Sequence, residues 1–407
     1  MKICLLSYRG NPYCGGQGIY IHYLSRELSK LGHEVQVLSG PPHPEVVEAV
    51  KVHKVESLNL YDSAGFSPAK PSQLLNPVNF YEFAAVRLGM FPEPLTFSIR
   101  AYGKLRELLS HFRFDVIHDN QSLGYGLLLM KRFKIPLIST IHHPIPIDRQ
   151  IEITHARSWQ QKFRIMKWYS FVNMQRRVSR RMDRIINVSE SSAEETRRLF
   201  KVPQEKLRVV YNGVDGNLFK TDNSVPREPN SLIMVGEGRI KGFLYLLRAI
   251  QSLRNEVKIK LTVVGRGPPD NQYASRLLKE CGLEDTVTFT GRISAEELAK
   301  RYSAVEVAIV PSLYEGFGFP AAEAMSCKLP LVATKAGALP EVVGEDGESA
   351  ILVPPSDSDA LATAIKRLLA DELLRRKMGE AGRKRVERNF TWEQAAKRTL
   401  EVYQELL

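Results

Sequence analysis

The sequence contains no long apolar run. Its first ten residues offer only the short run from Ile3 to Leu6 behind a single lysine, which is too little for a signal peptide. No later run approaches the roughly 18 apolar residues that a membrane span needs. We therefore expect a cytoplasmic protein that does not cross a membrane.

Cysteine is scarce as well. The four cysteines have neither metal-type nor redox-type spacing, and they are Cys4, Cys14, Cys281 and Cys327. Thiols in the cytoplasm stay reduced, so we expect structural cysteines and no disulfide.

Acidic residues are too few to balance the basic ones. The chain has 57 Lys and Arg against 45 Asp and Glu, a formal net charge of +12. Such an excess predicts an anionic partner. The net charge alone does not distinguish among nucleic acid, an anionic bilayer and a phosphorylated substrate.

The basic residues cluster between Arg157 and Arg184, where nine Lys or Arg accompany one acid, Asp183. Apolar residues recur in this stretch at helical spacing, at Trp159, Phe163, Met166, Met174, Val178 and Met182. One explanation of this stripe is an amphipathic helical stretch whose apolar residues face the core and whose basic residues face solvent. A basic amphipathic surface that meets anionic lipid headgroups explains it equally well.

Length and pattern predict two domains, because 407 residues are more than one hydrophobic core usually accommodates. Short β-rich runs alternate with helical patterns, which is typical of parallel sheets in doubly wound α/β folds. The first set of expected strands is 3–7, 35–39, 116–119, 137–141, 185–188 and 209–211. The second set is 232–235, 261–264, 287–290, 307–310, 331–333 and 351–353.

A polar, proline-bearing stretch from Asp222 to Asn230 separates the two sets of strands, as expected of a linker. We place the first domain at 1–217 and the second at 218–387. Beyond them, an amphipathic run from Ala395 to Leu407 predicts a terminal helix with Thr391 as its N-cap.

The most informative stretch follows the expected strand 307–310. It begins at Pro311, passes through a glycine-rich turn and places Pro320 at a plausible first helical position. Glu315 precedes the turn and Glu323 lies about one turn into the helix, so the two carboxylates would reach one ligand from different directions. Backbone N–H groups at the helix start can face an anion. This combination suits a ligand that carries both phosphate and hydroxyl groups.

The pattern Pro-Ser-x-Tyr-Glu-Gly-Phe-Gly-x-Pro-x-x-Glu-Ala-Met, from Pro311 to Met325, resembles the donor-site signature of family-4 retaining glycosyltransferases of the GT-B fold. Further matches fall in the family's order, at 15–18, 140–142, 212–215, 241–242, 265–267 and 334–341. The resemblance covers nearly the whole chain. It implies two Rossmann-like domains facing a central cleft, with a C-terminal helix at 388–407 that crosses back to the first domain. One departure is Lys328, where glycine is common, and it puts the local turn in doubt.

The resemblance assigns the donor diphosphate to two places. Gly15, Gly16 and Gly18 lie between the first strand and a helix expected near Ile19, where backbone amides and the helix dipole would hold diphosphate. A nicotinamide-binding dehydrogenase is excluded, because Gly-x-Gly-x-x-Gly and an acid at the end of the second strand are both missing. In the second domain, Arg239 and Lys241 resemble the family's pyrophosphate-binding pair, although Arg239 is not in its usual register.

The resemblance also assigns residues to the sugar and the nucleoside. Glu323 would accept hydrogen bonds from the ribose, and Glu315 would hold the sugar's hydroxyls or stabilise developing positive charge. His142, at the end of an expected strand, would position the transferred sugar, with the neighbouring His143 as a less favoured choice. The remaining expected donor contacts come from loop ends and backbone amides, at Gly265, Arg266, Arg292, Ile293, Gly316, Phe317, Gly318 and Phe319.

A proline-rich, poorly periodic segment from Asn59 to Phe97 lies where acceptors bind in this family. We expect it to be irregular and to help choose the acceptor. The pattern Asp357-Ser358-Asp359 resembles a metal-binding Asp-x-Asp, but its position before an amphipathic run favours helix capping. We therefore expect neither a metal nor another cofactor.

Together these observations predict a retaining glycosyltransferase that moves a hexose or N-acetylhexosamine from a nucleotide sugar to a hydroxyl acceptor. The basic aromatic stretch favours a glycolipid or polyprenyl-linked acceptor with peripheral contact to an anionic membrane, and no nucleic-acid partner. A nucleotide-sugar epimerase or phosphorylase of the same fold, or a non-catalytic basic binding protein, are the alternatives. The donor base, the linkage and the oligomeric state are not readable from the sequence.

Overall fold

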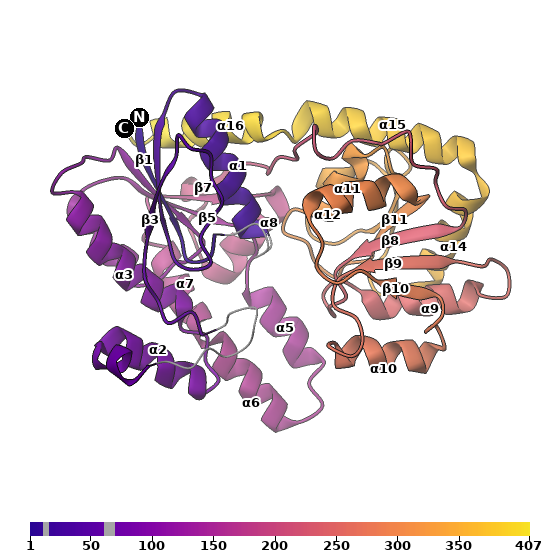
Figure 1. Cartoon of the computed structure of the whole chain (residues 1–407), viewed down its shortest axis with the longest axis horizontal. Helices are drawn as coiled ribbons and strands as arrows, with labels where there is room; N and C mark the ends of the chain where they lie inside the picture. Colours follow the sequence, from indigo (N-terminus) through magenta and orange to yellow (C-terminus); the bar gives the residue numbers. More distant parts are fainter. Residues whose placement is uncertain (11–15, 61–69) are drawn as a thin grey trace. The chain divides into compact units, whose positions relative to one another are not determined.

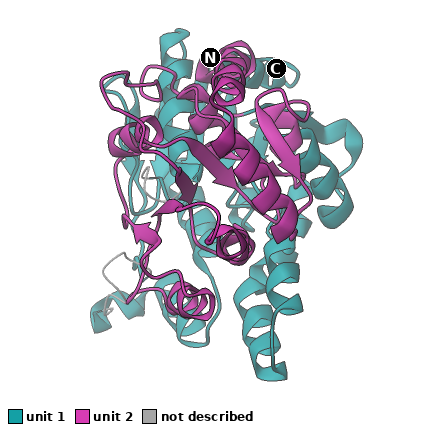
Figure 2. Cartoon of the chain, turned by 90° about the vertical axis from the view of Figure 1, so that its right-hand side faces the viewer, with its two compact units in different colours: residues 1–211, 395–407 teal, residues 212–394 magenta. Residues whose placement is uncertain are grey.

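A computed structural model describes residues 1–10, 16–60 and 70–407. The chain forms two compact units, of which unit 1 comprises residues 1–211 and 395–407 and unit 2 comprises residues 212–394 (Figure 2). Each unit is built around one parallel sheet with helices on both faces (Figure 1).

The sheet of unit 1 has the strand order β3-β2-β1-β4-β5-β6-β7, with every neighbouring pair parallel. Its strands are β1 (Lys2–Ser7), β2 (Glu34–Ser39), β3 (Lys51–Lys54), β4 (Val116–Asn120), β5 (Leu137–Ile141), β6 (Arg184–Asn187) and β7 (Leu207–Val209). The sequence did not predict β3. That strand lies at the sheet edge, where only His53 is buried, so it lacks the apolar run by which a central strand is recognised.

Helices of unit 1 surround this sheet. They are α1 (Gly16–Lys30), α2 (Pro77–Arg87), α3 (Glu93–Leu108), α4 (Gly126–Met130), α5 (Pro146–Thr154), α6 (Trp159–Trp168), α7 (Val172–Ser179) and α8 (Glu190–Glu195). Single turns of other helix types connect them at η2 (Pro71–Leu75), η3 (Lys131–Phe133), η4 (Tyr169–Phe171), η5 (Thr196–Phe200) and η6 (Gln204–Lys206).

The expectation of an irregular segment between Asn59 and Phe97 was wrong over much of its length. Residues 61–69 of that segment lie outside the described part of the chain, but η2, α2 and the start of α3 are regular. Pro77 and Pro94 do not break these helices, because each occupies a first-turn position where no intrahelical N–H is needed.

Unit 2 has a six-stranded parallel sheet in the order β10-β9-β8-β11-β12-β13. Its strands are β8 (Ser231–Val235), β9 (Lys260–Val264), β10 (Val287–Phe289), β11 (Val307–Val310), β12 (Leu331–Thr334) and β13 (Ala350–Val353). Each of the twelve strands expected from the sequence has a counterpart in the two sheets, although β7 (Leu207–Val209) begins and ends two residues before the expected 209–211. The predicted doubly wound α/β fold is therefore confirmed.

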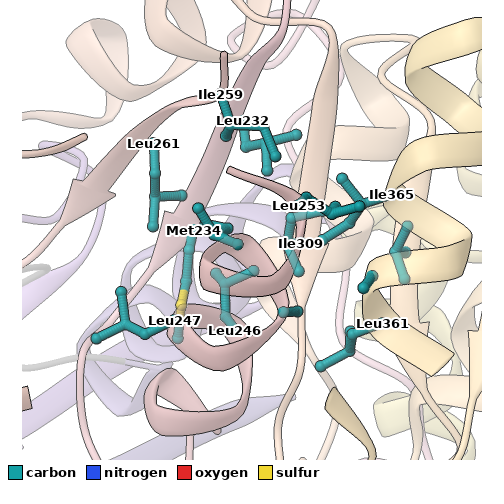
Figure 3. Packing of buried hydrophobic residues seen from close by; sticks show 14 of the residues in the cluster. Leu232, Met234, Leu246, Leu247, Leu253, Ile259, Leu261, Ile309, Leu361 and Ile365 are labelled. Atoms are coloured by element: carbon teal, nitrogen blue, oxygen red, sulfur yellow. The ribbon is translucent and has the colours of Figure 1, made fainter. Parts of the chain in front are cut away.

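The core of unit 2 lies between its sheet and the helices that cover it. Figure 3 shows Leu232 and Met234 of β8 beside leucines of α9 (Phe243–Leu253), and Ile365 of α14 (Ser358–Ala370) near Leu253 of α9. Leu232, Met234 and Ile365 are almost fully buried. Burying one such side chain stabilises the folded state by about 1.5–3 kcal/mol. The helices of this unit are α9 (Phe243–Leu253), α10 (Gln272–Cys281), α11 (Ala295–Ala304), α12 (Phe319–Ser326), α13 (Leu339–Val343), α14 (Ser358–Ala370) and α15 (Glu372–Asn389).

Two predicted helix caps are confirmed. The Asp357 carboxylate accepts a hydrogen bond of 2.8 Å from the backbone N–H of Ala360 at the start of α14. The hydroxyl of Thr391 accepts one of 3.3 Å from Gln394 at the start of α16 (Trp392–Gln404). After α12, Lys328 keeps the turn that glycine usually makes, because it adopts the left-handed conformation with φ of 55°.

The end of α16 belongs to unit 1 and is fixed there by a buried polar chain. The His118 ring contacts the Tyr403 hydroxyl at 2.5 Å and the Thr140 hydroxyl at 2.6 Å, and Thr140 also contacts the Tyr20 hydroxyl at 3.0 Å. Burial lowers the pKa of His118 to about 3, so the ring is neutral at physiological pH.

The basic aromatic stretch divides into two parts. Met174, Val178 and Met182 are buried in the core of unit 1, as the core-facing interpretation predicts. Trp159 and Phe163 of α6 are exposed, so the same interpretation is wrong for the first half of the stretch. Both halves have apolar residues at helical spacing, and only the packing distinguishes them.

Candidate functional site

Each sheet has a topological switch point, where two adjacent strands send their following chains to opposite faces. In unit 1 it lies between β1 and β4, and in unit 2 between β8 and β11. Ligands of open α/β sheets bind beyond the carboxyl ends of the strands at such points. Most of the site residues expected from the sequence lie at these strand ends.

In unit 2 an ion pair joins the two sides of the switch point. Lys241, which follows β8, donates to Glu315, which follows β11, with Nζ 2.7 Å from Oε1. The hydroxyl of Ser312 donates to the same oxygen at 2.7 Å. Glu315 is 7% exposed, whereas the lysine side chain remains about a third exposed. The pair thus presents a fixed cation beside a largely buried carboxylate.

Two glycines permit this approach of the loops. Gly242 has φ of 75°, and a Cβ there would lie 1.8 Å from the carbonyl oxygen of Pro311. Gly337 has φ of 56°, and its Cβ would lie 2.2 Å from the carbonyl oxygen of Glu315. Any side chain at either position would push the loop that carries the Lys241–Glu315 pair out of place.

Glu323 lies on α12 and is almost fully buried. Its nearest polar partner is the Tyr302 hydroxyl, at 3.4 Å from Oε2. Burial raises the pKa of Glu323 to about 7, while the Tyr302 hydrogen bond and the charge of Lys241 lower it in part. A carboxyl group in this state changes charge near neutral pH.

The start of α12 differs from the sequence prediction by one residue, because the helix begins at Phe319 and not at Pro320. Gly318 is its N-cap, with φ of 96°. The ring of Phe317 is buried against the rings of Phe319 and Phe390, with centroids 5.2 Å and 5.6 Å away. Packing of these side chains fixes the backbone of the turn, which includes Gly316.

The other residues expected to contact the donor lie at the same edge of the sheet, but they differ in their contacts and in their exposure. The guanidinium of Arg239 lies 4.8 Å from the centroid of the Tyr273 ring. Gly265 leaves room for Glu237, whose carboxylate would clash with a Cβ there. Exposure is high for Arg266 after β9 and Arg292 after β10, and moderate for Ile293. The structure therefore joins Lys241 with Glu315 and leaves the outer arginines in the surrounding loops.

In unit 1, His142 is the first residue after β5. Its imidazole contacts Asn120, the last residue of β4. Nε2 of the ring lies 2.6 Å from Oδ1 of Asn120, and the Tyr20 ring packs edge-on at 4.6 Å between centroids. Burial is the main cause that lowers the pKa of His142 to about 3, and His118 contributes. The ring is neutral at physiological pH.

Asn120 fixes the tautomer of this ring. Its amide nitrogen donates to the carbonyl oxygen of Gln17 at 3.0 Å, so its Oδ1 must face the histidine and accept a hydrogen bond from Nε2–H. Nδ1 of His142 is then an acceptor, and this buried atom has no hydrogen-bond partner in the described part of the chain. A hydroxyl group of a ligand would satisfy it.

The neighbouring amide of Gln121 holds the backbone after β5. Its Oε1 accepts from the N–H of His142 at 2.7 Å, and its Nε2 donates to the carbonyl of His143 at 2.6 Å. The ring of His143 contacts Asp148 at 2.6 Å. The sequence analysis did not identify Asn120 and Gln121. Their position at the end of β4, which pairs with the strand preceding His142, would have indicated them.

The glycine-rich turn after β1 is only partly described. Gly15 lies outside the described residues, and α1, the helix expected to begin near Ile19, already includes Gly16, its first described residue. Gly16 and Gly18 both lie on α1, and the Gln17 carbonyl between them is the one that Asn120 contacts.

We expect Asn120→Ala to lower the kcat/KM of the reaction that uses His142 by about 10- to 100-fold, because the ring would lose its fixed tautomer and orientation. Nitrogen-15 spectra should show Nε2 protonated in the wild type and a tautomer mixture in the variant. Asn389→Ala, which removes an exposed amide on α15, is the control. A wild-type ring protonated on Nδ1 would contradict the assignment.

Neither a membrane span nor a metal cluster occurs in the residues described. None of their helices combines the length and apolar character needed to cross a bilayer. Within the same residues, no three His, Cys, Asp or Glu side chains are grouped to hold a metal ion.

Two family models match the chain. Residues 14–217 match Glycosyltransferase Family 4, and residues 217–385 match Glycosyl transferases group 1. The chain is 42% identical over 409 aligned positions to the MMP alpha-(1->4)-mannosyltransferase of Mycolicibacterium hassiacum, covering 100% of this chain and 98% of that protein.

Solved structures share the fold. The sucrose-phosphate synthase of Thermosynechococcus elongatus superposes with a TM-score of 0.76 at 25% identity, covering 100% of this chain and 99% of the other. Anabaena Alr3699/HepE in complex with UDP-glucose superposes with a TM-score of 0.71 at 19% identity, with both chains fully covered.

Proposed function

Because this chain belongs to glycosyltransferase family 4, with the group 1 glycosyl transferase match in its second half, we propose that it transfers an α-mannosyl residue from a nucleoside diphosphate sugar to a glycan hydroxyl. The relative from Mycolicibacterium hassiacum, itself named a mannosyltransferase, supports mannose within the broader hexose class. The observation that carries the proposal is the Lys241–Glu315 pair at the switch point of unit 2.

The chemistry of transfer fits these residues. Breaking the bond between the anomeric carbon and the diphosphate develops positive charge on the sugar and negative charge on the leaving oxygen. Lys241, with Arg239 nearby in the chain, would stabilise the diphosphate. Glu315 would face the sugar, and Glu323 as a carboxylate would accept hydrogen bonds from the ribose.

We propose retention of configuration without an enzymic nucleophile. The acceptor oxygen forms its bond to the anomeric carbon on the face that the diphosphate leaves, and the leaving phosphate oxygen takes the acceptor's proton. Nδ1 of the neutral His142 would accept a hydrogen bond from a hydroxyl of the transferred sugar. None of these steps uses a metal, so we propose metal-independent transfer.

For the acceptor, we propose a glycan that is carried on a lipid or polyprenyl anchor. The exposed basic and aromatic side chains of α6 support it, since such a surface would place the protein beside its substrate. A peripheral location at the inner face of the membrane follows from the same proposal.

Donor binding and turnover test the function. With EDTA present, thermal unfolding is measured with UDP, GDP and ADP and with their mannose conjugates. A ligand at about a hundred times its Kd stabilises the folded state by roughly 2.7 kcal/mol. We expect one base to stabilise the protein, and its mannose conjugate to release nucleoside diphosphate when an oligomannoside is added. Failure of every nucleotide sugar to stabilise the protein or to turn over would refute the proposal.

A further inference from the structure

Helix α6 carries an apolar face that points away from the rest of its unit. The exposed fractions of Trp159, Phe163 and Met166 are 74%, 56% and 58%. These positions are four and three residues apart and share one helix face. Ile165 packs against the core of unit 1 from another side of the helix, so the aromatic face is not the one that attaches α6 to the protein.

Lysines flank this apolar face. Lys162 precedes Phe163 and Lys167 follows Met166, and the ammonium of Lys167 lies 5.7 Å from the centroid of the Phe163 ring. Lysine side chains beside an apolar helix face can extend their charge toward headgroups while their stems stay among apolar groups. The arrangement is typical of a helix that lies in a bilayer interface.

A second group of exposed apolar residues belongs to the same unit, on η2, on α2 and directly after it. They are Leu75, Phe80, Tyr81 and Leu88. The two groups are linked where Phe91, three residues beyond Leu88, packs against Trp168 at the end of α6, with ring centroids 5.3 Å apart. Figure 1 shows α2, α5 and α6 in one part of unit 1.

Charge on these elements has one sign at the surface. Helix α6 contains three basic residues and no acid. The only acid of α2 is Glu82, which is buried and bonded to Arg100, whereas Arg87 at the end of that helix is exposed. Since η2, α2 and α6 are described throughout, no exposed carboxylate on them opposes a negatively charged partner.

We propose that the exposed face of α6, together with the apolar residues of η2 and α2, docks unit 1 onto an anionic lipid bilayer. Tryptophan and phenylalanine would enter the headgroup boundary, and Lys162 and Lys167 would meet lipid phosphates. Each lysine near an anionic surface contributes on the order of tenfold in affinity or less, so the apolar and basic parts are both needed. The proposal deepens the lipid-linked acceptor proposed above, but its test does not require transfer.

Vesicle binding by the full-length protein tests the surface. We expect co-sedimentation with vesicles of phosphatidylcholine and phosphatidylglycerol, little with phosphatidylcholine alone, and release as salt rises. Trp159→Ala/Phe163→Ala and Lys162→Glu/Lys167→Glu should each lower partitioning by about tenfold or more. Leu373→Ala, which removes an equally exposed apolar side chain from α15 of unit 2, is the matched control.

Tryptophan fluorescence locates the contact. Brominated acyl chains should quench the wild type, and Trp159→Phe should lose most of that quenching, because Trp392 is buried and Trp168, at 37%, is half as exposed as Trp159. Stabilisation by the donor nucleotide, measured in each variant, shows that the fold and the donor site are intact. Equal vesicle binding by the wild type and the Trp159→Ala/Phe163→Ala variant would overturn the proposal. Binding to a glycan or a protein through this face, without binding to vesicles, would overturn it too.

Discussion

Replacing Lys241 by alanine is expected to lower kcat/KM for sugar transfer by about 100- to 1,000-fold, the loss typical when one preorganised group facing a developing anion is removed. The lysine is held by Glu315 at 2.7 Å and needs no reorganisation when the leaving diphosphate gains charge. Initial rates of nucleoside diphosphate release, measured over a range of donor concentrations, give the effect on kcat and on KM separately.

A double variant distinguishes catalysis from charge balance. Removing Lys241 alone leaves the buried Glu315 carboxylate without its cation, which could perturb the loop by itself. In a Glu315→Gln background that carboxylate is absent, and we still expect Lys241→Ala to reduce the remaining rate by about tenfold or more. Lys260→Ala, which breaks an exposed pair with Glu228, should leave the rate nearly unchanged. Equal rates for Glu315→Gln with and without Lys241 would mean that the lysine only neutralises its partner.

Donor binding is expected to strengthen by about tenfold between pH 6 and pH 8. With a pKa of about 7, Glu323 is about 10% ionised at pH 6 and about 90% at pH 8, and only the carboxylate can accept both ribose hydroxyls. Calorimetric titration with the nucleotide sugar measures the affinity, because its phosphates do not titrate in this range. Glu323→Gln should bind more weakly, with an affinity independent of pH.

The stability of the free protein should change in the opposite direction. The folded-state pKa of Glu323 lies above the ordinary value of 4.5, so the folded state holds the proton more tightly. The resulting stabilisation is fully present below pH 4.5 and is lost as the pH rises through 7, by up to about 3 kcal/mol. Urea unfolding of the wild type and of Glu323→Gln at pH 5 and pH 8 gives the difference. A constant difference between the two proteins would contradict a raised pKa.

Local pattern decided most of the secondary structure. Most of the expected strands are short runs of apolar and β-branched residues that are largely buried, and such runs can be recognised without knowledge of their neighbours. The caps at Asp357 and Thr391 were equally predictable, since an N-cap acts only on N–H groups two or three residues away. The errors occur where local rules conflict, as at Pro77, which opens α2 within the segment that was expected to be irregular.

The sequence by itself determined the doubly wound fold, the order of the motifs, the place of Lys241 and Glu315 in loops after strands and that of Glu323 on the following helix, because these depend on neighbours within a few residues. Only the tertiary structure decided the chemical state of the site. The tautomer of His142 depends on Asn120, the pKa of Glu323 on burial beside Tyr302, and the exposure of Trp159 on which face of α6 meets the core. Each of these properties arises from groups far apart in the chain, which the fold brings together and separates from water.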